Sequence, residues 1–156
     1  MGEVKVVPLE GWHLTEIELQ PMQAYAKTKC EDPRFRAMLA NNTDGFTMLV
    51  DNGEGKRPTI IAICGVITED TGLGSAYAFI SKHFKEYAVR LTRGIKKFLK
   101  EKLATKYHRI ESVACVEFEE ALRWHHMLGF TLESIKKQAT VYRQDVALYV
   151  MIREGE

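Results

Sequence analysis

The sequence predicts an α/β protein with one mixed sheet, in which antiparallel and parallel strands occur together. Two changes in the spacing of apolar residues indicate this fold class. From 45 to 80, apolar residues alternate or form short β-branched runs, which is typical of strands. From 84 to 103 they recur at three- and four-residue steps, as in an amphipathic helix. The apolar run 110–116 follows this helix, so strand, helix and strand predict a parallel crossover pair.

The N-terminal part predicts one strand and two helices. Residues 4–8 are β-branched and end in a proline, which favours an edge strand. Apolar positions over 15–29 predict a first helix, with its proline in an early turn. Asp32 is an N-cap for a second helix, which we expect to end at Asn41 and Asn42.

The middle of the chain predicts an antiparallel meander. Strands are expected over 46–50, 59–68 and 75–80, where β-branched and aromatic residues gather. The segments 51–55 and 69–74 are rich in Gly, Asp and Asn, and they predict the two turns. Three antiparallel strands therefore precede the long helix.

The C-terminal part predicts an interior strand, a helix and a hairpin. The strand 110–116 is followed by a helix over 119–128, which Gly129 ends in a left-handed cap. Strands over 130–135 and 140–152 then form an antiparallel pair. The chain is thus expected to contain about four helices in a single domain, 1–156.

Composition sets the broad class. The chain has 156 residues, of which 46% are hydrophobic and 28% charged, as in an ordinary globular domain. It contains no apolar run long enough to span a membrane and no secretory signal, so we expect a cytoplasmic protein without a membrane partner. The three cysteines are widely spaced and lack a Cys-x-x-Cys pair, so we expect free thiols and no metal site.

The long helix carries a strong local charge. Between Lys82 and Arg109 there are ten Lys or Arg residues against Glu86 and Glu101, although the whole chain is only +1. One interpretation is an ordinary solvated helix face. The other is a site for anions, either a phosphate-bearing cofactor or nucleic acid.

The order of elements and the segment 121–130, Ala-Leu-Arg-Trp-His-His-Met-Leu-Gly-Phe, resemble the GCN5-related N-acetyltransferase (GNAT) superfamily. This segment is similar to the Ala-x-x-x-Tyr-x-x-x-Gly-Phe helix of that family, and the resemblance covers nearly the whole chain. It implies a GNAT-like fold and an N-acyltransferase, in which a small-molecule or protein amine attacks the thioester of acetyl-CoA.

The resemblance also implies a cofactor site. The strand ahead of the long helix would lend main-chain groups to the pantetheine arm, and a turn at the start of the helix would hold the pyrophosphate. The turn departs from the Arg/Gln-x-x-Gly-x-Gly/Ala pattern of the family, and basic side chains would have to replace bare backbone. The implied cofactor-binding residues are Phe79, Ile80, Ser81, Lys85, Tyr87, Ala88, Val89 and Arg90.

Candidate catalytic residues come from the resemblance and from the position of residues at strand ends. His125 stands where family members often have a tyrosine that reprotonates the CoA thiolate, and histidine exchanges protons near neutral pH. Glu117 and Glu69 lie at strand ends and are candidates for the general base, with Glu117 preferred. The alternative is that His125 is an interfacial helix residue and that the glutamates are solvated.

The altered turn and the very basic helix are also similar to a divergent branch of GNAT-like proteins encoded by short-tailed phages. This looser resemblance, which rests on 79–130, makes a second hypothesis possible. The protein would be a catalytically inactive binding or structural module that holds nucleic acid or a protein through the helix 82–109. Its location would then be the host cytoplasm or the virion, and a homodimer is expected by analogy with similar folds.

Overall fold

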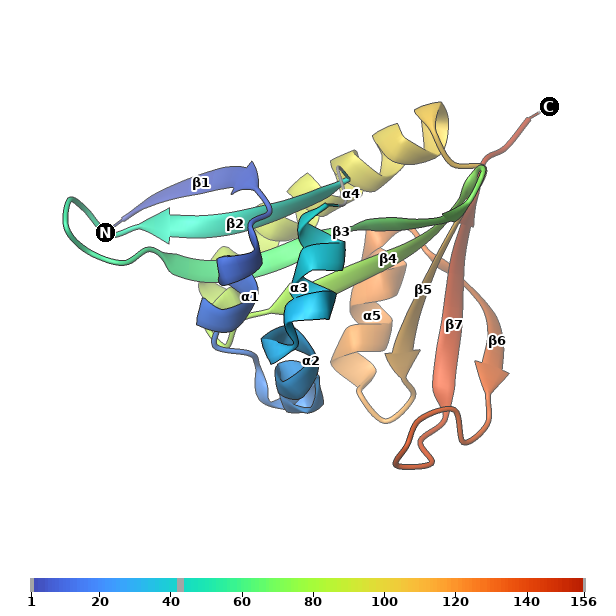
Figure 1. Ribbon diagram of the computed structural model, residues 1–156. Coiled ribbons are helices and arrows are strands. Elements are labelled where there is room, and N and C mark those ends of the chain that lie inside the picture. The colour runs from blue at the N-terminus through green and yellow to red at the C-terminus, as the bar shows by residue number, and fades with distance from the viewer. Residues whose placement is uncertain (1, 42–43, 156) are drawn as a thin grey trace. The chain divides into compact units, whose positions relative to one another are not determined.

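The computed structural model describes residues 2–41 and 44–155 (Figure 1). The strands are β1 (Glu3–Pro8), β2 (Gly45–Asp51), β3 (Thr59–Asp70), β4 (Leu73–Ile80), β5 (Arg109–Cys115), β6 (Thr131–Lys136) and β7 (Val146–Ile152). The helices are α1 (Gly11–Glu16), α2 (Lys27–Glu31), α3 (Pro33–Ala40), α4 (Ala88–Thr105) and α5 (Glu119–Leu128), with 3₁₀ turns η1 (Pro21–Ala26) and η2 (Phe84–Tyr87). No helix in these described parts is long and apolar enough to cross a membrane.

The described strands are hydrogen-bonded in the order β1-β2-β3-β4-β5-β7-β6. Strands β1 and β2, β2 and β3, β5 and β7, and β6 and β7 pair antiparallel. Strands β4 and β5 pair in parallel over 73–75 of β4, as a crossover through α4 requires. The predicted α/β class, with its mixed sheet, central parallel pair and C-terminal hairpin, is confirmed.

The chain divides into two compact units. The first contains Met1–Ile67 and Tyr77–Leu91, and the second contains Thr68–Ala76 and Thr92–Glu156. The prediction of a single domain, 1–156, stays a prediction. The first unit has a core of ten buried side chains: Leu9, Leu14, Ile17, Ala26, Cys30, Leu39, Leu49, Ile60, Ile63 and Phe79. Buried side chains of the second unit include Ile95, Leu99, Tyr107, Ile110, Leu128, Phe130 and Tyr149.

The single helix predicted over 15–29 is wrong, because the chain forms α1, η1 and α2 there instead. The residue before a proline is sterically driven out of the helical region, and Gln20, which precedes Pro21, is extended at φ −62° and ψ 152°. Leu19 then forms an isolated bridge with Ser81. Pro21 therefore divides the predicted helix, and the residues just before it, Leu19 and Gln20, are extended.

The other helices follow their predicted signals. The side chain of Asp32 accepts a hydrogen bond from the main-chain N–H of Arg34 at 2.9 Å, which caps α3. The predicted end of this helix at Asn42 lies outside the described residues. Gly129 ends α5 in a left-handed conformation at φ 102°, as predicted. Helix α4 begins only at Ala88, later than predicted, because η2 precedes it.

The three cysteines are free thiols, as predicted. Cys30 and Cys64 are buried and Cys115 is half-buried. Burial raises the pKa of Cys30 to about 11 and also raises the pKa of Cys64. Both thiols therefore stay protonated at neutral pH and fill space in the first unit.

Candidate functional site

The predicted cofactor residues Phe79, Ile80 and Ser81 lie together at the buried end of β4, in the first unit. The main-chain N–H of Ser81 donates to the carbonyl of Ile61 in β3 at 2.9 Å. The main-chain N–H and C=O groups of successive strand residues point to opposite edges of the strand. Those of Ser81 and Phe79 therefore point toward β3. Ile80 and Ala78 therefore face the opposite edge of β4.

That edge is occupied by the segment that precedes α2. The side-chain amide of Gln23 donates to the carbonyl of Ala78 and accepts from the N–H of Ile80, both at 2.7 Å. The main-chain N–H of Gln20 donates to the carbonyl of Ile80 at 2.9 Å. The side-chain amide of Gln23 thus bonds to β4 as a peptide group of a neighbouring strand would. The resemblance assigns main-chain groups of Ile80 to a pantetheine arm, and both of them have a partner within the chain, as does the carbonyl of the neighbouring Ala78.

The predicted turn lies directly after this strand. The hydroxyl of Ser81 accepts from the N–H of His83 at 3.0 Å, and its carbonyl accepts from the N–H of Phe84 at 3.0 Å. Together these bonds start η2, which leads into the N-terminus of α4. The five predicted residues of the turn lie in η2 and the first turn of α4: Lys85, Tyr87, Ala88, Val89 and Arg90. The structure therefore places them at the positive end of a helix dipole.

Two of the basic side chains at this turn are open to solvent. Lys85 and Arg90 are exposed, and no ion pair involves either of them among the described residues. Lys82 instead pairs with Glu18, and this bond lowers the pKa of the Glu18 carboxyl. Of the basic side chains at this turn, Lys85 and Arg90 therefore have no ion pair among the described residues and can meet an anion with their full charge.

In the second unit, His125 projects from α5 and forms two hydrogen bonds. Its Nδ1 lies 2.7 Å from the carbonyl oxygen of Ala121. A carbonyl oxygen only accepts, so Nδ1 carries the proton. In the neutral ring Nε2 is then an acceptor, and the hydroxyl of Ser112 donates to it at 2.8 Å. This arrangement makes the neutral His125 ring a proton acceptor at Nε2.

The surroundings of His125 keep the ring neutral and fixed. Its residue is 8% exposed, and the ring stacks on Tyr149 with 4.8 Å between centroids and 20° between planes. The centroid of the Phe130 ring lies 5.5 Å from the centroid of the His125 ring. Burial lowers the pKa of His125, the bond to the Ala121 carbonyl partly offsets this, and the neighbouring His126 lowers the pKa further.

Glu117 lies just beyond the end of β5 and is exposed. The side-chain amide of Gln144 donates to its carboxylate at 2.9 Å. Among the described residues, no hydrogen bond joins Glu117 to His125. Glu69, the other candidate for the general base, lies near the end of β3 and is also exposed. The catalytic roles of His125 and Glu117 stay predictions.

Sequence reasoning missed Ser112 and Gln23. Ser112 is one of two polar residues, with Glu111, in the otherwise apolar run 110–116, and this was its only signal. Gln23 has no signal at all, because its partners in β4 lie 55 and 57 residues further along the chain.

The exposed face of α4 carries a cluster of charges in the second unit. Arg93, Lys96, Lys97 and Lys100 are all exposed, and they follow one another at helical spacing. Within the described parts of the chain, no ion pair involves any of the four. We call these four residues the basic face of α4.

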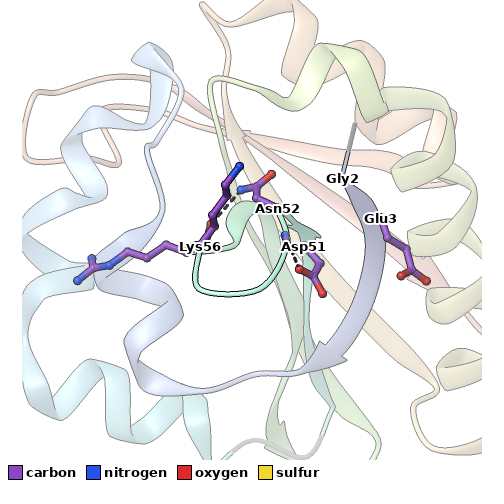
Figure 2. Close-up of a pocket in the computed structure, with 7 residues that line it drawn as sticks. Gly2, Glu3, Asp51, Asn52 and Lys56 are labelled. Atoms are coloured by element: carbon purple, nitrogen blue, oxygen red, sulfur yellow. Dashed lines mark hydrogen bonds between the residues drawn. The ribbon is translucent and has the colours of Figure 1, made fainter.

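An open pocket of about 790 Å³ lies in the first unit, beside the turn between β2 and β3. Figure 2 shows the residues around it. It is lined by Gly2, Glu3, Asp51, Asn52, Gly53, Lys56 and Arg57. Asp51 accepts hydrogen bonds from the N–H of Gly53 at 2.9 Å and from Lys5 at 3.0 Å, which lowers its pKa. None of the predicted site residues lines this pocket.

No protein-family model matches the sequence, and no curated protein matches it. Solved structures do. A GNAT-family acetyltransferase from Bacillus anthracis matches with a TM-score of 0.68 and 15% identity, over 99% of this chain and 98% of that one. The chain has the GNAT fold. Two further structures with this fold match at TM-scores of 0.66 and 0.63. They are a ribosomal-protein-S5-alanine acetyltransferase from Vibrio fischeri and a spermidine/spermine N-acetyltransferase from Vibrio cholerae.

The likeness extends along the whole chain in each case. The Vibrio fischeri protein is 15% identical over 99% of this chain and 95% of its own, and the Vibrio cholerae protein 16% over 97% and 93%. At such identities the match shows the fold alone. The GNAT fold predicted from the segment 121–130 and the order of elements is therefore confirmed, and the chemistry has to be argued from the residues.

Proposed function

We propose that the protein is an acetyl-CoA-dependent N-acyltransferase that acts on an amine. One observation carries this proposal: the chain matches acetyltransferases of the GNAT fold over almost its entire length. Spermidine is an amine, and an amine is the acceptor that attack on a thioester requires. The phage-like branch predicted from the sequence is a finer hypothesis within the same fold.

In this proposal the acyl group moves directly from the thioester to the amine. The neutral ring of His125 takes up the amine proton through the Ser112 hydroxyl as the C–N bond forms and the C–S bond breaks. The imidazolium then returns this proton to the departing thiolate. Glu117 is the alternative general base, since its exposed carboxylate also attracts a cationic amine.

The cofactor would bind through charge and by displacing Gln23. Lys85 and Arg90 meet the phosphates at the N-terminus of α4, where anions are stabilised. The pantetheine arm requires the main-chain groups of Ala78 and Ile80, to which the Gln23 side chain is bonded. Removal of this side chain should therefore strengthen cofactor binding.

Isothermal titration of acetyl-CoA and free CoA tests the proposal. Lys85→Glu and Arg90→Glu should each weaken binding about tenfold or more, because a hydrogen bond to a charged group contributes about 1.5–3 kcal/mol. Lys56→Glu, which makes the same charge change at the turn between β2 and β3, should leave the affinity unchanged.

Displacement of the Gln23 side chain by the cofactor can be tested with a matched pair of variants. Gln23→Ala should raise the affinity for CoA, whereas Gln20→Ala should not, since Gln20 bonds to Ile80 through its main-chain N–H. If neither CoA nor acetyl-CoA binds the wild-type protein or Gln23→Ala at millimolar concentration, the acyltransferase proposal fails.

A second candidate function is binding of duplex nucleic acid by the basic face of α4, as expected for an inactive module. Two observations favour it: the four exposed charges of that face, and the occupied edge of β4. The exposed face presents lysines and arginines rather than aromatic rings, which suits phosphates of a duplex better than stacked single-strand bases. Affinity for a DNA duplex should then fall steeply with salt, and Lys97→Glu should reduce the slope by about 1. Salt-independent or undetectable binding at low salt would exclude this function.

A further inference from the structure

We propose that Ser112 is a nucleophile that accepts an acyl group from a thioester or an activated ester, with His125 as its base. This goes beyond the proposed direct transfer, because a covalent acyl-serine requires neither the amine nor the CoA turn. The site lies wholly within the second unit, on β5 and α5.

The geometry contains the three parts of an activated hydroxyl. The nucleophile is the Ser112 hydroxyl, which donates to Nε2 of His125 at 2.8 Å. The base is His125, whose bare Nε2 points at that hydroxyl. The orienting group is the carbonyl of Ala121, which accepts from Nδ1 at 2.7 Å and holds the ring in the one tautomer that can take the proton.

The ring of the base is held in place by its neighbours, and the nucleophile is only partly buried. Stacking on Tyr149 fixes the plane of the His125 ring, and burial keeps the ring uncharged. Ser112 is half-buried, and within the part of the chain that the structure describes its hydroxyl has the single recorded bond to His125. The hydroxyl oxygen therefore retains lone pairs for attack on an acyl carbon.

The step balances without a further reactant. The Ser112 oxygen forms a bond to the acyl carbon, its proton moves to Nε2 of His125, and the C–S or C–O bond to the leaving group breaks. The imidazolium gives its proton to the leaving thiolate or alkoxide. Water or an amine then attacks the acyl carbon and gives its proton to Nε2 of His125. The bond between the acyl carbon and Oγ of Ser112 breaks, and the imidazolium returns this proton to Oγ, which restores the serine hydroxyl.

The full chain treated with p-nitrophenyl acetate provides the test. Release of p-nitrophenolate is followed over time, and peptide mapping by mass spectrometry locates the acetyl group. We expect the peptide containing Ser112 to be acetylated early. Ser112→Ala should lose this label, and His125→Gln should slow acetylation of Ser112 roughly 100-fold, since glutamine accepts a hydrogen bond but takes up no proton. Ser134→Ala, a change at an exposed serine of β6, is the matched control and should react like the wild type.

Two results would overturn the proposal. One is a folded wild-type protein acetylated only on lysines or the N-terminus, with Ser112 unmodified. The other is unchanged acetylation of Ser112 in His125→Gln. Neither depends on a variant of Ser112 that folds, and neither depends on CoA. Loss of CoA binding would thus defeat the proposed function and leave this inference intact, and the reverse also holds.

Discussion

Two buried histidines of this protein each lie 2.8 Å from a hydroxyl group, yet they are built for different purposes. In the second unit, His125 pairs with Ser112. In the first unit, Nδ1 of His13 lies 2.8 Å from the Thr47 hydroxyl and also accepts the N–H of Glu10 at 3.0 Å. Its proton is therefore on Nε2, the opposite tautomer to His125. Nε2 of His13 has no hydrogen-bond partner among the described residues.

In these two histidines, the main-chain partner of Nδ1, rather than the hydroxyl group, decides which ring nitrogen carries the proton and which can accept one. A carbonyl beside Nδ1 of His125 leaves Nε2 free to take a proton from Ser112. An N–H beside Nδ1 of His13 engages the nitrogen that faces Thr47, and this bond is part of the cap of α1. Thr47 is also fully buried, whereas Ser112 is half-buried. We infer that the His13 pair holds the fold and that the His125 pair is available for chemistry.

The largest effect expected from this comparison is on stability. His13→Ala should reduce the free energy of unfolding by about 2–5 kcal/mol, because it leaves a cavity in a fully buried site and removes the hydrogen bond that the His13 side chain contributes to the cap of α1. Urea unfolding followed by circular dichroism measures this. The folded variant should still acetylate Ser112 at the wild-type rate, and a loss of that reaction would contradict the division of roles.

A smaller effect sharpens the comparison between the two hydroxyls. Ser112→Ala should cost about 1–3 kcal/mol, since it leaves Nε2 of the buried His125 ring without a donor. Thr47→Val should cost less than about 1 kcal/mol, because Nδ1 of His13 retains the N–H of Glu10. Paired urea titrations give both values, and a larger loss in Thr47→Val than in Ser112→Ala would reverse the assignment.

The smallest effect is the dependence of stability on pH. Burial lowers the pKa of both His13 and His125, so between the folded and the ordinary pKa the unfolded chain binds more protons. The contribution of these two histidines to the free energy of unfolding is therefore fully present above about pH 6.5. It is lost as the pH falls toward their pKa values in the folded protein. Melting temperatures measured from about pH 8 to pH 5 should fall at the acid end, a window above the usual carboxylate range. The fall should be smaller in His125→Gln, and an equal fall in that variant would remove the contribution assigned to His125.

Much of the fold was predictable because its signals are local. The stripe of Leu91, Ile95 and Leu99 repeats at helical spacing, and all three side chains are buried in α4. Gly129 follows an apolar helix, and it adopts the positive φ that glycine tolerates best. These patterns depend only on neighbouring residues, so they can be read without knowing the rest of the chain.

Part of the candidate site was predictable, and part was not. His125 was found because it occupies a recognisable position in 121–130, but the sequence assigned it only a general exchange of protons. Ser112 lies 13 residues earlier and meets His125 only after α5 has packed on β5. The bonds of Gln23 to β4 require a break at Pro21 and a return of the strand more than fifty residues later.

By itself, then, the sequence determined the type and order of most elements, the buried stripe of α4, the charge of its outer face and the position of the histidine in α5. The tertiary structure alone decided which hydroxyl and which main-chain group meet each histidine, which tautomer results, and what covers the edge of β4. The physical reason is one of range. Periodicity, caps and turns arise from contacts between near neighbours, whereas the protonation state of a buried ring depends on partners that only the folded chain brings within hydrogen-bond distance.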